Sequence, residues 1–337
     1  MLHLRVTSPP DRTEAVLHLL ETCPGTAHLA VLEGAARLPA HGDLVIADVA
    51  RESVDELVEN LRELGIHQNG GIAIEVLDTV ISDAAEKAED DAPGEGADAV
   101  IWEEVVRRTS QDSVLSWTYV VFLFLATTLA AIAVILDSAI LVIGAMVVGP
   151  EFGPIAAIAV GLVHGRIGLL RTSFVTLVVG FVIAIVGTTL LCLIAWAVGW
   201  IGPEVFDGER PLTGFIWRPD KWSFVVAFIA GVAGVVSLTS SKSGALVGVF
   251  ISVTTVPAAG DFALALALGN GREMGGSATQ LGVNLTAMVL AGVLTLVAQK
   301  LLRQPFQSIR DRIPMGTDAS RSVSSAASPV RTEENQP

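Results

Sequence analysis

Apolar segments long enough to cross a lipid bilayer recur through the last two thirds of this chain. A transmembrane helix needs about 20 predominantly apolar residues. Six segments reach or approach that length: 118–136, 138–163, 172–200, 222–239, 244–268 and 277–302. They predict an all-α membrane domain of about six spans over residues 117–302, with the lipid bilayer as its partner.

Charge separates this apolar part from what precedes it. Residues 1–116 carry 23 acidic and 8 basic side chains, a net charge of −15, whereas the whole chain has a net charge of −14. The acidity therefore lies outside the membrane part. An acidic surface repels the anionic backbone of DNA and RNA, so no nucleic acid is expected as a partner.

Residues 1–78 alternate between strand and helix patterns. We expect strands at 2–6, 27–32, 42–49 and 71–77, helices at 11–21 and 53–64, and a turn region at 34–41. Ser53 is expected to cap the second helix and Gly65 to end it. The order βαββαβ is that of a ferredoxin-like α+β domain. We interpret it as a regulatory or assembly module.

Two segments flank the membrane part. Residues 79–116 are predicted to form an acidic linker followed by an amphipathic helix, over 99–116, that lies against the membrane surface. Residues 303–337 are rich in serine and arginine and are predicted to be a disordered cytoplasmic tail.

Basic residues predict the orientation. With six crossings and the N-terminus inside, nine lie in the cytoplasm (Arg107, Arg108, Arg166, Arg171, Lys242, Lys300, Arg303, Arg310, Arg312) and four lie outside (Arg210, Arg218, Lys221, Arg272). This obeys the positive-inside rule. No signal peptide pattern opens the chain. We expect a multi-pass inner (plasma) membrane protein with both termini cytoplasmic; the alternative makes 138–163 a re-entrant hairpin.

The membrane part contains an internal similarity. A shift of 105 residues pairs Trp117 with Trp222, and a shift of 107 pairs Pro150 with Pro257. Each half, 117–200 and 222–302, holds three spans, so the halves would have opposite orientations. This predicts an inverted-topology repeat, an arrangement found in many secondary transporters. The alternative is chance similarity between apolar helices.

The second span of each half contains residues that interrupt a helix. Proline removes a backbone donor and clashes with the preceding turn, and unwound backbone is tolerated in a bilayer only where protein or water covers it. We predict an ion or substrate site between the two breaks, with these candidates: Pro150, Glu151, Gly153, Thr254, Thr255, Pro257, Gly260, Asp261 and Asn284. The alternative is a pair of packed kinks.

Glu151 and Asp261 are the two carboxylates near the predicted breaks. A carboxylate within the bilayer is costly unless it is paired or protonated, so the two suggest a proton or cation site. Each could instead cap a helix, and Asn284 could join two helices. His164 is the only histidine after residue 67. No catalytic residue, metal or cofactor is therefore expected, and we do not expect an enzyme.

The run from Ser116 to Leu162 resembles a bacterial and archaeal membrane family catalogued as domain of unknown function 389, as does the entry segment 102–110. The family pattern S-x-x-x-x-IGAM-x-x-x-P-x-x-GPI is matched by Ser138, 143–146, Pro150 and 153–155. Glu151 departs from the apolar residue common in the family. The resemblance supports the architecture and implies no catalytic residues.

Two functional hypotheses follow. The first is a secondary transporter or channel-like protein for an unknown ion or small molecule, gated or assembled by the N-terminal domain. The second is a non-transporting scaffold or sensor whose N-terminal domain binds a ligand or partner. The sequence is compatible with a homo-oligomer in either case.

Overall fold

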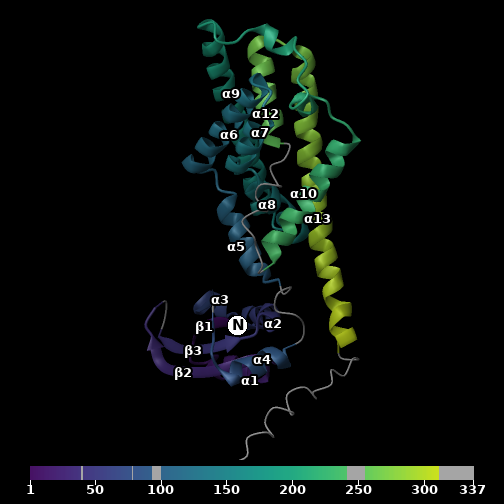
Figure 1. Ribbon diagram of the computed structural model, residues 1–337. Coiled ribbons are helices and arrows are strands. Elements are labelled where there is room, and N and C mark those ends of the chain that lie inside the picture. The colour runs from purple at the N-terminus through teal and green to yellow at the C-terminus, as the bar shows by residue number, and fades with distance from the viewer. Residues whose placement is uncertain (39–40, 78, 93–99, 241–254, 311–337) are drawn as a thin grey trace, which may run out of the picture.

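The computed structural model describes residues 1–38, 41–77, 79–92, 100–240 and 255–310. These residues form a small N-terminal domain and an elongated helical bundle, with the domain lying at one end of the bundle (Figure 1). We call this the domain end, and the other the far end.

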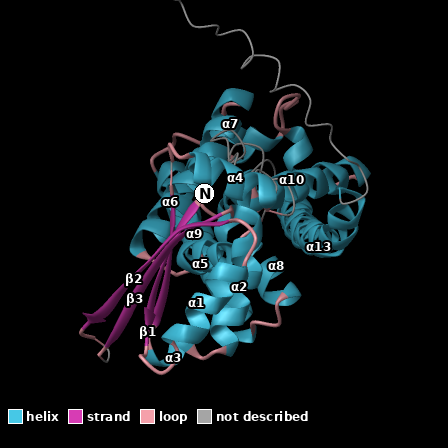
Figure 2. Ribbon diagram, turned by 90° about the horizontal axis from the view of Figure 1, so that it is seen from below, coloured by secondary structure: helices cyan, strands magenta, loops and turns pink. Residues whose placement is uncertain are grey.

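The N-terminal domain contains β1 (Leu2–Ser8), α1 (Thr13–Thr22), β2 (Thr26–Ala36), β3 (Gly42–Val49), α2 (Arg51–Glu63), the short α3 (Ile66–Asn69) and β4 (Gly71–Val76). Its strands form one antiparallel sheet in the order β2-β3-β1-β4. Helices α1 and α2 lie side by side on one face of the sheet (Figure 2). Alternate strand residues such as Leu2, Leu4 and Val6 are buried, as expected for a sheet covered on one face.

Two local predictions in this domain were wrong. Strand β2 continues to Ala36, so the turn region expected from residue 34 begins later. Ser53 does not cap α2, because that helix begins at Arg51. The Ser53 hydroxyl instead donates to the Pro24 carbonyl at 2.5 Å, which joins α2 to the loop before β2. Gly65 does follow the end of α2, in the left-handed conformation with φ of 70°.

Two helices connect the domain to the bundle. Helix α4 (Asp83–Asp91) contacts β2, and α5 (Trp102–Asp112) follows. The buried side of α5 contains Val105, Val106 and Thr109, and it packs against α8. The apolar side of α5 is therefore covered by protein, and its place at the membrane surface stays a prediction.

The bundle contains α6 (Trp117–Ile135), α7 (Ala139–Val148), α8 (Phe152–Val163), α9 (Ile167–Ala197), α10 (Lys221–Thr239), α12 (Thr255–Leu268) and α13 (Gly271–Arg310). Two short 3-10 helices, η1 (Pro203–Phe206) and η2 (Gly214–Trp217), lie between α9 and α10. Within the described residues, α6, α9, α10 and α13 are long and apolar enough to cross a membrane. The pair α7–α8 makes a fifth candidate if it is a single bent span.

The helix break predicted within residues 138–163 is confirmed. Helices α7 and α8 are bent by 55° relative to each other, with the break at residues 149–151. The second predicted interruption, at Pro257, stays a prediction: Pro257 lies within α12, and residues 241–254 before that helix are outside the described residues.

Helix α12 lies inside the bundle and contacts α6, α9 and α13. Its described residues are almost all buried, including Ala258, Ala259 and Leu264. Because α12 has no long lipid-facing side, its polar residues face protein. Two helices extend beyond the apolar segments that predicted them. Helix α9 begins at Ile167, before the expected residue 172, and α13 extends to Arg310, past the domain boundary expected at residue 302.

Candidate functional site

Glu151 lies at the break between α7 and α8 and is completely buried. It occupies the position just before α8, yet its side chain makes no capping hydrogen bond to that helix. One carboxylate oxygen instead accepts a 2.6 Å hydrogen bond from the Thr255 hydroxyl at the start of α12. The break in the first half of the bundle therefore contacts α12 of the second half directly.

Two predicted glycines permit close approach of neighbouring helices. A Cβ at Gly260 would lie 2.6 Å from the Ala130 Cβ and 2.8 Å from the Thr127 carbonyl oxygen, both on α6. A Cβ at Gly153 would lie 2.7 Å from the Asp112 Cβ on α5. These distances are below ordinary contact, so both glycines allow packing that a side chain would prevent.

Four other predicted residues lie in different parts of the structure. Pro257 is buried in α12, whose described residues begin at Thr255. Pro150 lies in the break itself. Asn284 on α13 is completely buried. Thr254 lies outside the described residues.

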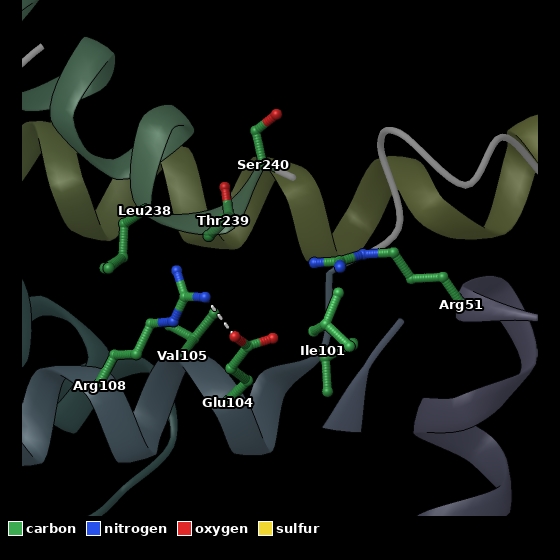
Figure 3. Close-up of a pocket in the computed structure, with 9 residues that line it drawn as sticks. Arg51, Ile101, Glu104, Val105, Arg108, Leu238, Thr239 and Ser240 are labelled. Carbon is green, nitrogen blue, oxygen red and sulfur yellow. Dashed lines mark ion pairs between the residues drawn. The ribbon is translucent and has the colours of Figure 1, made fainter. Parts of the chain in front are cut away.

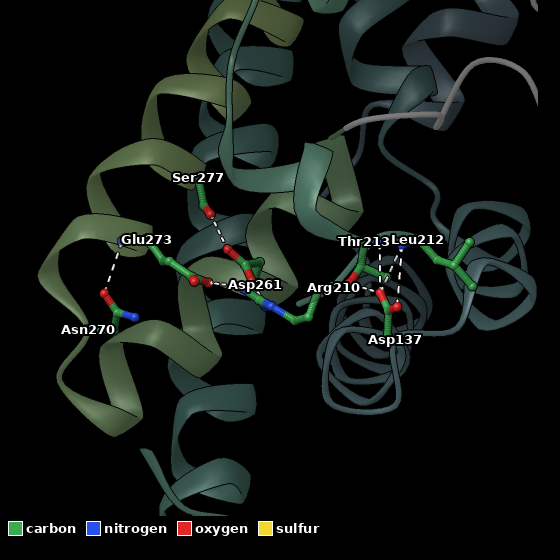
Figure 4. A network of polar contacts seen from close by, with 8 residues as sticks. All are labelled: Asp137, Arg210, Leu212, Thr213, Asp261, Asn270, Glu273 and Ser277. Atoms are coloured by element: carbon green, nitrogen blue, oxygen red, sulfur yellow. Dashed lines mark hydrogen bonds and ion pairs between the residues drawn. The ribbon is translucent and has the colours of Figure 1, made fainter. Parts of the chain in front are cut away.

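Asp261 belongs to a different group of contacts, near the far end of the bundle. It lies inside α12, so it does not cap that helix. Its carboxylate accepts a hydrogen bond from the Ser277 hydroxyl of α13 and is 3.5 Å from a guanidinium nitrogen of Arg210. The second terminal nitrogen of Arg210 pairs with Glu273 (Figure 4). We call Arg210, Asp261, Glu273 and Ser277 the far-end cluster.

The far-end cluster is almost sealed from solvent. The side chains of Arg210, Asp261 and Glu273 are 7%, 0% and 5% exposed. Two carboxylates share one guanidinium, so the group has one negative charge in excess when all three are ionised. A buried, unbalanced charge of this kind is costly, and binding of a proton or cation would offset it.

The loop that carries Arg210 is anchored beside this cluster. The Asp137 carboxylate accepts hydrogen bonds from the backbone amide of Leu212 at 3.2 Å and from the amide and hydroxyl of Thr213 at 2.9 and 2.8 Å (Figure 4). The turn between α6 and α7 thus holds the loop against the bundle, and Arg210 extends from that loop to α12 and α13.

The two predicted carboxylates thus have different partners. Glu151 contacts Thr255, and Asp261 lies six residues further along α12, a rise of about 9 Å. Sequence reasoning missed Arg210, Glu273 and Ser277, and Asp137 was assigned no role. Arg210 and Asp261 are far apart in the chain, so no helical spacing links them. The signal for Glu273 and Ser277 was their helical spacing, which places both on one side of α13.

Comparisons with known proteins support the family resemblance. Residues 146–290 match the family model described as "Domain of unknown function (DUF389)". An uncharacterized protein of Methanocaldococcus jannaschii is 26% identical over 210 residues, which cover 62% of this chain and 63% of the relative. The chain thus aligns with somewhat less than two thirds of that relative's length. No solved structure matches significantly.

Proposed function

We propose that this chain, whose residues 146–290 match the DUF389 family model, is a membrane transport protein and not an enzyme. In this proposal it couples movement of an unknown ion or small molecule to a proton or cation. The observation that carries the proposal is Glu151, a completely buried carboxylate at a broken helix, hydrogen-bonded to the start of α12. A carboxylate at such a position costs several kcal/mol unless it is paired or protonated, which is why such residues often mark ion pathways.

The packing of α8 and α12 supports an inverted repeat. Helix α8 of the first half contacts α13 of the second, and α12 of the second half contacts α9 of the first. In transporters built this way, sites lie between the halves, next to interrupted helices.

The far-end cluster supports a closed state on that side. Arg210 reaches from the loop to carboxylates on α12 and α13 and crosses the space between those helices. In this proposal the ion pairs hold the loop closed while the Glu151 side faces the other compartment. Asp261 then takes part in closure and in ion coupling.

Basic residues at the two ends support a cytoplasmic N-terminal domain. Arg107, Arg108 and Arg166 lie at the domain end, where Arg166 is 3.3 Å from Glu103 of α5. Fewer arginines and lysines of the described residues lie at the far end, so the positive-inside rule favours the domain end as cytoplasmic. We propose an inner-membrane location with both termini inside. The strand order, with β3 between β1 and β2, supports a ferredoxin-like domain that regulates or assembles the bundle.

Ion flux into proteoliposomes tests the proposal. Purified protein is reconstituted with a pH-sensitive dye inside, and proton, sodium and potassium gradients are imposed in turn. We expect flux from the wild type and at least a tenfold lower rate from Glu151→Gln, because the amide cannot exchange a proton or hold a cation. Glu209→Gln makes the same chemical change at an exposed loop position and should leave the rate unchanged. No flux for any ion, or an unchanged rate in Glu151→Gln, would contradict the proposal.

One observation favours the second function, a scaffold or sensor. Glu103 of α5 pairs with both Arg62 of α2 and Arg166 at the start of α9, so the N-terminal domain is joined to the bundle through α5. A domain connected in this way can transmit ligand binding to the helices without transport. Wild-type protein that gives no flux but binds a small molecule through its N-terminal domain would favour this function.

A further inference from the structure

Polar side chains follow one buried side of α13. Four of them are completely or almost completely buried: Glu273, Ser277, Gln280 and Asn284. At 3.6 residues per turn, their spacing keeps them within about 60° of one another around the helix axis. The buried residues that continue this side beyond Asn284 are apolar, beginning with Ala287. We call Ser277, Gln280 and Asn284, which follow Glu273, the polar row.

Helices α12 and α13 form a hairpin that places one end of the polar row at Asp261. The two helices contact each other and are joined by a turn at residues 269–270. Residues at equal distances from this turn therefore lie at similar heights. The Ser277 hydroxyl donates a hydrogen bond to the Asp261 carboxylate, and each of these residues is eight positions from residue 269. This bond agrees with the register expected for the hairpin.

The other end of the polar row lies at the height of Glu151. In the same register Thr255, which is 14 positions before residue 269, is opposite residue 283 and next to Asn284. Thr255 is also the residue whose hydroxyl donates to the Glu151 carboxylate. The row thus spans the distance from Asp261 to Glu151, which over seven residues of α13 is a rise of about 10 Å.

Gln280 lies between these two ends and has an acceptor without a partner. The residue is 1% exposed, and its Oε1 atom accepts no hydrogen bond from the part of the chain that the structure describes. The residue opposite it in the hairpin is Ala258, which is buried and has no polar side chain. A buried amide oxygen in this position is costly unless a small donor such as water satisfies it.

The polar row differs from the charged side chains at the domain end of the bundle. There a cavity of about 110 Å³ lies between α5 and the end of α10, and Glu104 pairs with Arg108 at its wall (Figure 3). The Glu104 and Arg108 side chains are 18% and 46% exposed, so bulk water reaches them. The polar row is sealed inside the bundle, so solvation by bulk water does not account for its polarity.

We propose that the polar row carries protons between Asp261 and Glu151, along water molecules held by the amides of Gln280 and Asn284. At a hydrogen-bond distance of about 2.8 Å, about three water molecules bridge a separation of about 10 Å. The Asp261 carboxylic acid gives its proton to the first water, and the last water gives a proton to the Glu151 carboxylate. Only O–H bonds break and form. This inference rests on the proposed transport function and makes the proton its coupling ion.

The composition of the polar row favours protons over a metal cation. A metal cation that crosses this distance needs oxygen ligands to replace its hydration shell at each step. The row offers one hydroxyl and two neutral amides, and the opposite residue, Ala258, offers no ligand. A proton needs only a continuous chain of hydrogen bonds, and carboxylates such as Asp261 and Glu151 are the usual donors and acceptors of proton relays in membranes.

Proton flux into proteoliposomes tests the proposal. Full-length protein is reconstituted with a pH-sensitive dye inside, and a membrane potential drives protons inward. We expect at least a tenfold lower rate from Gln280→Leu and from Asn284→Leu than from the wild type, because leucine holds no water. Thr279→Val changes a neighbouring polar residue on the exposed side of α13 and should leave the rate unchanged.

Unfolding in mixed micelles separates a proton path from a packing role of Gln280. Gln280→Leu replaces a buried amide, whose oxygen has no partner among the described residues, by an apolar side chain of similar size. Its unfolding midpoint should therefore equal or exceed that of the wild type. Gln280→Asn keeps an amide and should retain at least a third of the wild-type proton flux. A rate that falls only together with the midpoint shows a packing role and overturns the proposal.

The outcomes also separate the proton path from transport itself. Proton flux that Glu151→Gln abolishes and Gln280→Leu retains overturns the path and leaves the proposed function standing. Sodium or potassium flux from the wild type without proton flux has the same consequence. Wild-type protein that carries none of these ions overturns both.

Discussion

Removal of the Arg210 side chain should destabilise the bundle severely. Arg210→Gln leaves Asp261 and Glu273 buried beside each other without their shared cation, and their side chains are only 0% and 5% exposed. Breaking a buried ion pair by removing one partner typically costs about 3–5 kcal/mol, because the remaining charge has no compensation. We therefore expect the free energy of unfolding to fall by about 3–5 kcal/mol.

The measurement is unfolding of purified protein in mixed micelles, with the denaturing detergent increased stepwise and helix content followed by circular dichroism. Arg218→Gln is the matched control, because Arg218 lies on the same loop, is exposed, and contacts the ring of Trp217. An exposed substitution of this kind should cost about 0.5 kcal/mol or less. The triple variant Arg210→Gln, Asp261→Asn, Glu273→Gln removes all three charges and should recover much of the loss, since buried charge clusters are strongly non-additive.

Equal stability of Arg210→Gln and Arg218→Gln would refute this reasoning. It would mean that water reaches the far-end cluster and screens its charges. If Arg210→Gln is unstable and the triple variant does not recover the loss, packing of the aliphatic part of Arg210, and not its charge, stabilises the bundle.

Two further predictions concern other parts of the fold. Gly260→Ala should lower the unfolding free energy by about 1–3 kcal/mol, because its Cβ would overlap backbone atoms of α6. Gly282→Ala on α13, where a Cβ has no atom within 4 Å, should be neutral or slightly stabilising in the same micelle assay. A similar loss of stability in both variants would contradict this prediction. In the N-terminal domain, hydrogen bonds from the Thr13 hydroxyl and the Gly34 amide lower the pKa of Asp43. The contribution of Asp43 to stability is therefore complete above the ordinary aspartate pKa of about 3.9 and is lost as the pH falls through the lower folded-state pKa. Asp43→Asn should flatten the dependence of the unfolding free energy on pH between about pH 5 and 2. An unchanged pH dependence would argue against this role of Asp43.

Short-range patterns predicted most of the elements correctly. The alternation of apolar residues placed all four strands of the N-terminal domain within a few residues of their observed bounds. Proline and glycine at 149–154 predicted the break between α7 and α8, because no continuous helix tolerates that combination. One failure was also local: the Ser53 hydroxyl bonds to a distant carbonyl instead of capping α2.

The candidate site was predicted as a set of residues and not as an arrangement. Glu151 and Asp261 were expected to line one site, but Glu151 contacts Thr255 and Asp261 contacts Ser277 and Arg210. Sequence places each carboxylate in an apolar segment, where it must be compensated. It does not identify the compensating group, because that group comes from another helix or loop.

The sequence alone determined that the chain has apolar segments long enough to span a membrane and that its acidity lies before them, since hydrophobic length and charge are properties of short segments. Only the tertiary structure decided which buried charges meet. Arg210 and Asp261 are 51 residues apart, and Thr255 and Glu151 are 104 residues apart. Helix packing brings each of these pairs together, and no periodicity along the chain records it.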